Sequence, residues 1–385
     1  MKKVLYLFDA LKRGGAETST LEIAKRFKNW VPVMVCIYEG TELRNDFEEA
    51  GIKVYSLDIK EKFGIAIAMK KIQEIQEIEK PDVIHANLFM AEQFSRWLGP
   101  KNKIPVINSF VNDSYSRERY ELLNFKQKLV LNLYKAADRY SANKVSKFMS
   151  LTQAIIPNNT KALNIEPKAV VVIPRGRNII AFRDKVNLDT VNTIKEKYGN
   201  GPLILTVSRL LIRKGYMEAI NAIDLVVKKY PDVKYLIAGK GHDESKIRTL
   251  IKELNLKNNV FLLGSRDDVP SLLEAADIFL FPSHYEGQGG ALIEAMLMEK
   301  KIIATRIPVL EESVKDNLSA KLFDYRNVKD MADKIMWAIE NPDKMNKLAS
   351  MAKKEAEQRF SIEEIAEKHE KLYDEVLNNF QGSLV

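Results

Sequence analysis

Residues 202–239 read PLILTVSRLLIRKGYMEAINAIDLVVKKYPDVKYLIAG, and two kinds of pattern alternate in them. The short apolar run at 203–207 predicts a buried strand, and apolar residues at helical spacing follow over 215–230. A second apolar run at 233–239 completes a strand–helix–strand unit. Such units form parallel sheets with helices on their faces, which indicates an α/β fold.

The same alternation runs through both halves of the chain, beginning with a strand at 2–8. It is interrupted once, near 173–201, where the sequence becomes polar and ends in glycines. Two runs of this kind predict two doubly wound, Rossmann-like domains. We expect them at 1–180 and 181–360.

Composition limits the class of protein. The 385 residues exceed what one ordinary core holds, and 46% hydrophobic with 29% charged residues is typical of a soluble globular chain. Cys36 is the only cysteine, which excludes an internal disulfide and suits a reducing compartment. The N-terminal apolar run is short for a signal peptide, and no stretch approaches the roughly 20 apolar residues of a membrane span. We therefore expect a cytoplasmic protein.

The net charge of +8 is concentrated in one segment. Residues 92–147 contain eleven Lys or Arg and five Asp or Glu, so they carry +6. This local excess predicts an anionic partner. Because Leu, Phe and Tyr alternate with the cations over 116–147, a helix there could lie on an anionic membrane surface. The alternative is a solvated helical face; nucleic acid is not expected, since no binding motif accompanies the charge.

A candidate site lies in FPSHYEGQGGALIEAM, residues 281–296. The strand end of a parallel sheet borders the usual ligand crevice, and a helix that starts near Gly289 would point free N–H groups at an anion. Glu286 and Glu294 should lie roughly 8–12 Å apart at the rise of a helix. Two such carboxylates predict contacts with two parts of one long ligand, for example with sugar hydroxyls. The alternative is a glycine turn with two incidental surface glutamates.

Two further stretches follow predicted strands. TVSRLLIRKGY carries Arg209, Arg213 and Lys214, and cations at a strand end would neutralise a diphosphate. A solvated basic turn is the alternative. FDALKRGGAET places Gly14 and Gly15 at a helix start, where their N–H groups can reach a phosphate. This stretch matches neither GxGxxG nor Walker A, so a dinucleotide or P-loop site is not expected.

Together these motifs resemble glycosyltransferase family 4. The resemblance rests on GGAE after the first strand, SRLLIRKG, and EGQGGALIE with seven residues between its glutamates. IPRGR, YLIAGKGHDESKIRTLIKEL and NVFLLGSRDDVPSLLEAADIFLFPS follow the family's order and spacing. The match covers nearly the whole chain and is strongest from about 170 to 325. It implies the GT-B fold, with two Rossmann-like domains facing a central cleft.

The resemblance also implies which substrate each domain binds and which reaction the protein catalyses. The first domain would bind the acceptor, the second the nucleotide-sugar donor, and the helix at about 361–385 would pack back on the first. The reaction implied is a retaining transfer, from a UDP-sugar by preference, to a glycan that can be lipid-linked, in surface polysaccharide biosynthesis. Neither a metal nor a cofactor is expected, in keeping with the lack of a DxD motif. The enzyme would be cytoplasmic, with the option of a peripheral position on the inner face of the cell membrane.

The resemblance implies roles for individual residues. Arg209 and Lys214 would hold the leaving diphosphate and Glu286 the sugar, so these three are the expected catalytic residues. Glu294 would bind the ribose. Further donor contacts are expected from Gly14, Gly15, Gly264, Arg266, Gly289, Gly290, Ala291 and Leu292.

The chain departs from the family at two places. The family usually has a histidine after the fifth strand of the first domain, but PVINSFVNDSY has none. Asn112 or Asp113 can take its place. Arg175 in IPRGRN replaces a more common asparagine near the cleft. These departures keep open two alternatives, a nucleotide-sugar epimerase of GT-B fold and a non-catalytic nucleotide-sugar-binding protein.

The four histidines are scattered along the chain. His85 is expected after the fourth strand, near the acceptor, and a histidine bonded to a loop backbone is the alternative. His284 adjoins Glu286 and could touch the donor sugar. His242 and His369 are expected at the surface. This spacing does not predict a metal site.

Overall fold

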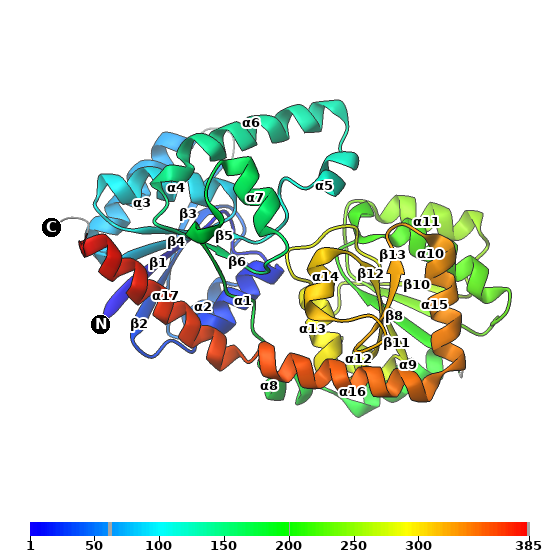
Figure 1. Cartoon of the computed structure of the whole chain (residues 1–385). Helices are drawn as coiled ribbons and strands as arrows, with labels where there is room; N and C mark the ends of the chain where they lie inside the picture. Colours follow the sequence, from blue (N-terminus) through cyan, green and yellow to red (C-terminus); the bar gives the residue numbers. More distant parts are fainter. Residues whose placement is uncertain (61–63, 200, 383–385) are drawn as a thin grey trace. The chain divides into compact units, whose positions relative to one another are not determined.

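The computed structural model contains two compact units (Figure 1). It describes residues 1–60, 64–199 and 201–382. Unit 1 comprises Met1–Arg177 and the C-terminal segment from Ile362, and unit 2 comprises Asn178–Ser361. Each unit is built around its own parallel sheet, so the expected α/β class is confirmed.

Unit 1 contains a seven-stranded sheet in the order β3-β2-β1-β4-β5-β6-β7. The chain starts in the middle, runs to one edge, returns to the centre and then runs to the other edge. This is the doubly wound arrangement, and the order reverses between β1 and β4. The strands are β1 (Lys2–Phe8), β2 (Trp30–Tyr38), β3 (Lys53–Ile59), β4 (Val83–Asn87), β5 (Val106–Phe110), β6 (Lys147–Ser150) and β7 (Val170–Val172).

Strand β1 shows why these residues form a central strand. Val4, Tyr6 and Phe8 belong to the core on one face of the sheet, while Leu5 and Leu7 belong to the core on the other. Because side chains alternate along a strand and helices cover both faces, the whole strand has to be apolar. The helices are α1 (Gly15–Ala24), α2 (Arg44–Glu49), α3 (Ile65–Glu79), α4 (Phe89–Lys101), α5 (Arg117–Glu121), α6 (Phe125–Ser141), α7 (Ile156–Leu163) and α17 (Ile362–Gly382).

The C-terminal helix α17 packs on unit 1. Its apolar residues recur at helical spacing and join the core that contains β1. The Glu370 carboxylate accepts hydrogen bonds from the backbone N–H groups of Lys28, Asn29 and Trp30, at 2.6–3.0 Å. His369 is buried in this interface, so the expectation of a surface histidine is wrong. The core residues that α17 contributes are Ile362, Ile365, Ala366, Leu372, Tyr373, Val376 and Leu377.

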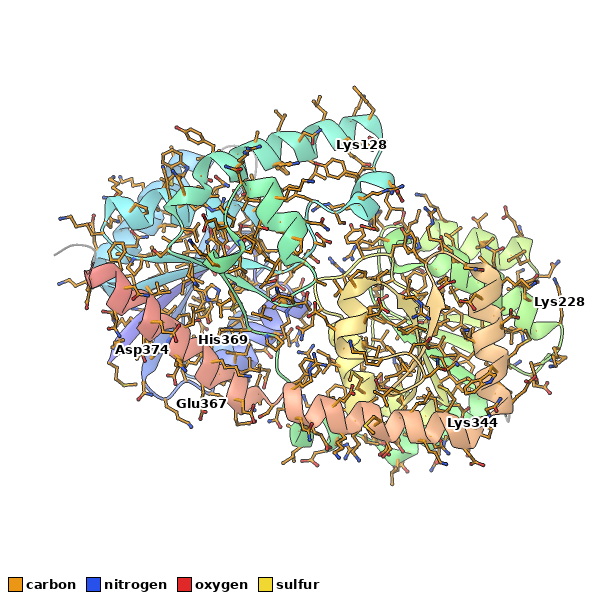
Figure 2. The ribbon with its side chains drawn as sticks, in the orientation of Figure 1. Lys128, Lys228, Lys344, Glu367, His369 and Asp374 are labelled. Atoms are coloured by element: carbon orange, nitrogen blue, oxygen red, sulfur yellow. The ribbon has the colours of Figure 1, made fainter. Side chains whose placement is uncertain are left out.

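The opposite face of α17 is solvated. Glu367 pairs there with Lys28 at 2.8 Å, and both side chains are largely exposed (Figure 2). Helix α17 therefore has one apolar and one polar face, and two polar residues, His369 and Glu370, are buried on the apolar face. His369 is a polar residue on the buried face, and its Nδ1 donates to the backbone oxygen of Ile365 at 2.8 Å.

Unit 2 contains a six-stranded parallel sheet in the order β10-β9-β8-β11-β12-β13. Here the order reverses between β8 and β11. The strands are β8 (Leu203–Val207), β9 (Lys234–Ala238), β10 (Val260–Gly264), β11 (Ile278–Phe281), β12 (Lys301–Arg306) and β13 (Lys321–Asp324). The helices are α8 (Ile179–Arg183), α9 (Leu188–Tyr198), α10 (Tyr216–Val227), α11 (Glu244–Glu253), α12 (Val269–Ala275), α13 (Gly290–Leu297), α14 (Pro308–Ser313), α15 (Val328–Glu340) and α16 (Pro342–Arg359).

The basic segment 92–147 folds as part of unit 1. Residues 116–147 form two helices, α5 and α6, rather than one. The break is at Asn124, whose side chain accepts from the backbone of Gln127 at 3.0 Å while Gln127 returns to the Asn124 N–H group. This reciprocal cap starts α6. Within the described residues, no helix has the length and apolar character needed to cross a bilayer.

Candidate functional site

The sheet of unit 2 brings the predicted catalytic residues to one edge. Arg209 and Lys214 follow β8, and Glu286 follows β11. These two strands are parallel neighbours, in the register Ile278 beside Ile204. Because parallel strands end at the same edge, both loops open onto the point where the strand order reverses, which is where open α/β sheets bind ligands.

Lys214 and Glu286 form a buried ion pair at this edge. The Lys214 ammonium donates to Oε1 of Glu286. Burial lowers the pKa of Lys214, and the neighbouring cations Arg213 and Arg209 lower it further. Burial alone would raise the pKa of Glu286, but Lys214 and Arg213 bring it below its usual value. The pair thus holds an ammonium that can meet an anionic leaving group and a carboxylate that can accept from hydroxyls.

The backbone around this pair is fixed by contacts between the two loops. The His284 N–H group donates to the Arg213 oxygen at 2.8 Å, and Arg213 Nη1 donates to the Tyr285 oxygen at 3.3 Å. Gly215 has φ +73°, and a Cβ there would lie 1.9 Å from the oxygen of Pro282. Only glycine fits such a position. The turn that carries Lys214 is therefore held tightly against the loop that carries Glu286.

His284 lies behind the ion pair, in a contact that the sequence did not reveal. Its Nε2 is 3.2 Å from Oε2 of Glu218, near the start of α10, and its ring meets the Tyr325 ring edge-on. Arg326 lies 3.4 Å from the other Glu218 oxygen. The Nε2 edge of the His284 ring thus faces Glu218. The expected contact of His284 with a donor sugar stays a prediction.

Helix α13 begins where the glycines predict. Gly289 caps it at φ +92°, and the helix runs from Gly290. Ala291 and Leu292 form its first turn, and the N–H group of Leu292 already donates to the Gly289 oxygen at 3.0 Å. Glu294 is half-buried one turn further in. The first turn therefore offers an anion-binding N-terminus at the same edge of the sheet as Glu286.

The remaining predicted donor residues lie at other strand ends. Gly264 ends β10, the edge strand, and Arg266 follows it and pairs with Asp268 at 2.7 Å. Arg209 is exposed just beyond β8. Among the residues that the structure describes, no group of three His, Cys, Asp or Glu side chains gathers as it would around a metal ion.

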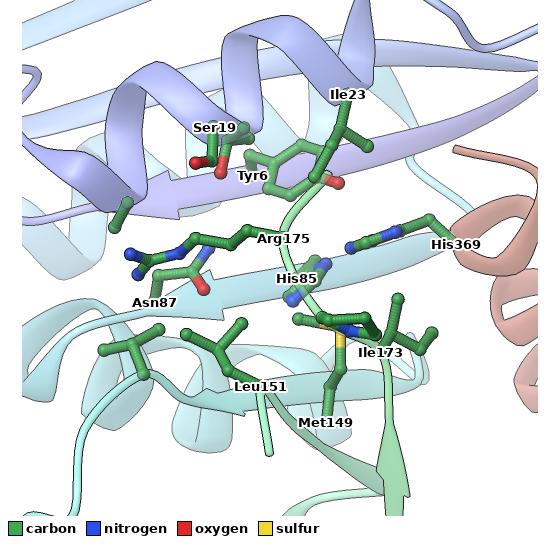
Figure 3. Close-up of a pocket in the computed structure, with 14 residues that line it drawn as sticks. Tyr6, Ser19, Ile23, His85, Asn87, Met149, Leu151, Ile173, Arg175 and His369 are labelled. Carbon is green, nitrogen blue, oxygen red and sulfur yellow. The ribbon is translucent and has the colours of Figure 1, made fainter. Parts of the chain in front are cut away.

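In unit 1, Gly15 opens α1 directly after β1 and lies beside Arg175. A Cβ on Gly15 would be 3.2 Å from Arg175 Nη1, so the guanidinium covers this helix start. Arg175 and His85 both line a cavity of about 20 Å³ between α1, β4 and α17 (Figure 3). That volume holds about one water molecule, so the cavity itself cannot accept a sugar.

His85 lies within β4, rather than after it as expected. Its Nδ1 is 2.9 Å from the Tyr373 hydroxyl and its Nε2 is 2.7 Å from the Ser109 hydroxyl. Its partners are therefore side chains, not a loop backbone. Burial and the neighbouring His369 hold the pKa of His85 well below its usual value, and burial lowers the pKa of His369 to about 4. Both histidines are neutral at neutral pH, and His85 connects the sheet to α17.

Asn112 and Asp113 lie in the loop after β5, where the family's histidine would be. The Asn112 backbone oxygen accepts from Asn159 at 3.2 Å, and Asp113 Oδ2 accepts from Asn158 at 2.8 Å. Burial raises the pKa of Asp113 to about 6. Both predicted alternatives to the histidine therefore remain in place at the end of a central strand.

The basic segment contains a buried ionic cluster that its sequence did not predict. Arg96 is fully buried and lies 3.0 Å from Glu92 and 2.9 Å from Asp138. Its Nε also donates to Asn108 at 2.6 Å. The i, i+4 spacing of Glu92 and Arg96 could have indicated the first pair. Part of the charge that predicted a basic surface is therefore neutralised in the core.

Two family models match the chain, one on each unit. The model of the glycosyl transferase 4-like domain matches residues 14–176, and the model of glycosyl transferases group 1 matches residues 189–355. The chain is a GT-B glycosyltransferase of the GT4 type. This membership confirms the family that the motifs resembled, and it favours sugar transfer over the epimerase and binding-only alternatives.

Two curated relatives of this glycosyltransferase are named for the synthesis of polymers. The poly(ribitol-phosphate) alpha-N-acetylglucosaminyltransferase of Staphylococcus aureus (strain COL) is 28% identical over 245 residues, which are 63% of this chain and 47% of the relative. The capsular polysaccharide biosynthesis glycosyltransferase CapH of Staphylococcus aureus is 26% identical over 305 residues, 77% of this chain and 79% of the relative. The chain thus spans about half the length of the first relative and most of the second.

Solved structures share the fold over almost the whole length. Anabaena HepE in complex with UDP-glucose superposes with a TM-score of 0.84 at 23% identity and covers 98% of this glycosyltransferase and 100% of HepE. Staphylococcus aureus TarM, with a TM-score of 0.75 at 17% identity, covers 97% of this chain and 99% of TarM. At these identities the likeness establishes the GT-B fold alone.

Proposed function

We propose that this glycosyltransferase moves a sugar from a UDP-sugar to a glycan acceptor in surface polysaccharide synthesis. The observation that carries the proposal is the buried Lys214–Glu286 pair at the strand-order reversal of unit 2. It places a cation and a carboxylate where a sugar diphosphate needs both. The UDP-glucose complex of HepE and the polymer-forming relatives support the choice of donor and acceptor.

The proposed roles follow the family resemblance on these residues. Lys214 and Arg209 neutralise the diphosphate, and Glu286 accepts from hydroxyls of the donor sugar. Glu294 accepts from the ribose, and the N–H groups of Gly290 and Ala291 at the start of α13 donate to a phosphate. Unit 2 is then the donor domain, with Gly264 at the end of β10 and Arg266 in the following loop beside the base.

The proposed reaction retains the configuration of the sugar and uses no metal. The bond between the anomeric carbon and the diphosphate oxygen breaks, and the acceptor oxygen bonds to that carbon on the same face. The acceptor proton passes to the diphosphate, which leaves as UDP. Lys214 and Arg209 stabilise the charge that develops on the diphosphate, so Glu286 is not required as a base.

A thermal-shift titration of the full chain with UDP, GDP and ADP tests the donor site. We expect UDP to raise the melting temperature and the other two nucleotides to raise it less, because a ligand that binds only the folded state stabilises it. Glu294→Ala should reduce the UDP shift by removing the ribose contact. Glu253→Ala, which removes an exposed carboxylate at the end of α11, serves as the control and should leave the shift intact. No shift with any nucleotide would remove the donor-site assignment.

We also propose that α6 lets the enzyme rest on an anionic membrane surface. Phe125 is 83% exposed and Leu129 is 55% exposed on this helix, and Lys126 and Arg139 are exposed on the same helix. Asp138 is the only acidic residue in α6, and it is buried against Arg96. The solvated face of α6 is therefore apolar and cationic, as in helices that bind anionic bilayers.

Co-sedimentation with vesicles tests this surface. We expect the wild type to pellet with vesicles of phosphatidylcholine and phosphatidylglycerol but not with phosphatidylcholine alone, and 0.5 M salt to weaken the association. Phe125→Ser with Leu129→Ser should reduce binding several-fold. Ile78→Ser, which removes an equally exposed apolar side chain from α3, is the control. Equal binding by all variants, or equal binding to neutral vesicles, would contradict the proposal.

A further inference from the structure

A groove runs along one edge of the sheet of unit 2. Its volume is about 530 Å³, and it follows β10, which is the last strand at that side of the described sheet. Helices α9 and α11 pack on opposite faces of this sheet, and both contribute residues to the groove (Figure 1). The groove is therefore an opening between two helices, with the edge of a strand as its floor.

The backbone of β10 offers hydrogen bonds along this floor. The Asn259 oxygen accepts from the Tyr235 N–H group of β9 at 2.6 Å, so Asn259 is directed toward the neighbouring strand. Because successive residues of a strand turn their backbone groups to opposite sides, Phe261 also faces β9, whereas the N–H and C=O groups of Leu262 face outward. No other strand in the described part of the chain pairs with this outer side. An added strand could donate and accept there.

Apolar side chains border the same edge. Phe261, Leu262 and Leu263 line the groove and are only partly buried. The Phe261 ring lies 4.9 Å from the ring of Tyr198, between centroids, on the side of the sheet that α9 covers. At about 3.3 Å per residue, the five residues of β10 extend roughly 17 Å. The groove thus offers an extended chain both apolar contacts and backbone hydrogen bonds.

The rim of the groove is cationic. Three of its basic residues lie in α11 or in the loop between α11 and β10, and the fourth lies near the end of α9. None of the described residues that line the groove is acidic. One of the four pairs with a glutamate outside the groove, Glu244, at 2.7 Å. The surface therefore attracts a negatively charged partner. The four exposed cations are Lys197, Arg248, Lys252 and Lys257, and Arg248 is the one paired with Glu244.

The same charges restrict which strand can pair with β10. Lysines beside a strand edge oppose the approach of another cationic edge. A second copy of this chain, joined through β10 across a two-fold axis, would bring Lys252 and Lys257 toward the same lysines of its partner. An acidic strand meets no such repulsion, so the charge favours an acidic partner over self-association.

We propose that the groove binds an acidic, extended segment of another protein, which joins the sheet as a strand beside β10. The backbone of the segment pairs with the outward N–H and C=O groups of Leu262. Side chains alternate between the two faces of a strand, so carboxylates on one face meet Lys252 and Lys257 on the α11 side. Apolar residues on the other face pack on Tyr198 and Phe261. The lining includes none of the proposed donor-binding residues, so this interaction goes beyond sugar transfer.

Fluorescence anisotropy of a labelled peptide with the full chain tests the proposal. The probe is a heptapeptide of alternating glutamate and valine with blocked ends. We expect saturable binding that 0.5 M salt weakens several-fold. The same peptide with lysine in place of glutamate should not bind. Binding of both peptides alike, or of neither, would overturn the proposal.

Two modified peptides test for strand pairing at unchanged charge. Methylating the backbone nitrogens of the valines blocks one edge of the extended peptide, and methylating those of the glutamates blocks the other. Because only one edge can face β10, one modification should weaken binding about ten-fold, the loss expected when backbone hydrogen bonds are removed, and the other should have little effect. Equal effects would show general attraction of a polyanion and contradict the proposal.

Matched variants locate the binding surface. Lys252→Glu with Lys257→Glu reverses two charges of the groove and should weaken binding of the glutamate peptide about ten-fold or more. Lys329→Glu with Lys347→Glu makes the same change in net charge at exposed lysines of α15 and α16 that do not line the groove, and it should bind as the wild type does. Equal weakening by the two pairs would overturn the assignment.

Hydrogen exchange and sedimentation distinguish the remaining occupants. Amide exchange in residues 260–264 should slow when the peptide binds, and unchanged exchange would exclude pairing with β10. Without peptide, we expect no dimer that protects these residues. Such a dimer would assign the groove to a second copy and overturn the proposal. None of these measurements uses UDP, so the proposed interaction and the proposed function can fail independently.

Discussion

Replacing Lys214 with alanine is expected to lower kcat/KM for the sugar donor about 10²–10³-fold, the usual cost of removing one group that stabilises developing charge. Lys214 is the buried cation at the proposed diphosphate, and alanine leaves no charge there. The measurement is UDP release from UDP-glucose, including the slow transfer to water. Lys228→Ala is the control, because Lys228 is exposed beyond the far end of α10 and pairs only weakly with Asp224 (Figure 2).

A second variant distinguishes a direct role of Lys214 at the diphosphate from an indirect role in neutralising Glu286. Lys214→Ala leaves Glu286 buried without its partner, so activity could fall because the loop is disturbed. The double variant Lys214→Met with Glu286→Gln removes both charges and keeps the volume, and it is compared with Glu286→Gln alone. Because UDP lacks the sugar that Glu286 would bind, the thermal shift with UDP reports on the diphosphate contact. If Lys214 serves the diphosphate, the double variant folds normally but loses the UDP shift that Glu286→Gln keeps. A UDP shift retained in the double variant would contradict that role and assign Lys214 to the support of Glu286.

Replacing Arg96 with methionine is expected to destabilise unit 1 by about 3–5 kcal/mol, the usual cost of breaking a buried ion pair from one side. Methionine fills a similar volume but leaves Glu92 and Asp138 facing each other without a cation. For a domain of this size the melting temperature should fall on the order of 10 °C. Thermal unfolding followed by circular dichroism measures this change.

Two comparisons make the Arg96 result specific. Arg139→Met removes an exposed arginine from the end of α6 and should change the melting temperature little. Arg96→Lys keeps the charge but loses the fork that reaches Asn108 and Asp138 together, so its loss should be intermediate. A lysine variant as unstable as the methionine variant would show that geometry rather than charge holds the cluster.

The sequence predicted much of the site because its motifs lie at fixed positions relative to predicted strands. Glu286, Gly289 and Glu294 are close in sequence, and the glycine cap and the start of α13 lie where the pattern indicated. The pairing of Lys214 with Glu286 could be inferred only through the family, since 72 residues separate them. Their contact exists because β8 and β11 are neighbours in the sheet, and strand order is a property of the tertiary fold.

Burial of polar residues was the part that sequence reasoning predicted least well. His369 lies on the largely apolar face of α17, and the pattern could not show that this face meets β1 and β4. The sequence predicted Arg96 as part of a basic surface. Three of its hydrogen-bond partners, Asn108, Asp138 and Ser141, come later in the chain and lie in β5 and α6. A buried polar side chain needs hydrogen-bond partners, and these often come from distant parts of the chain. A local sequence pattern does not show which distant groups supply them.

The sequence by itself determined the α/β class, the two-unit division, the family and the residues at the strand ends. These follow from periodicity and from motifs whose chemistry is local: a glycine at a helix start, a carboxylate after a strand, a cation in a turn. The tertiary structure alone decided which strand ends meet and which charges are buried. Such features depend on contacts between residues far apart in the chain, and the packing of the whole unit selects those contacts.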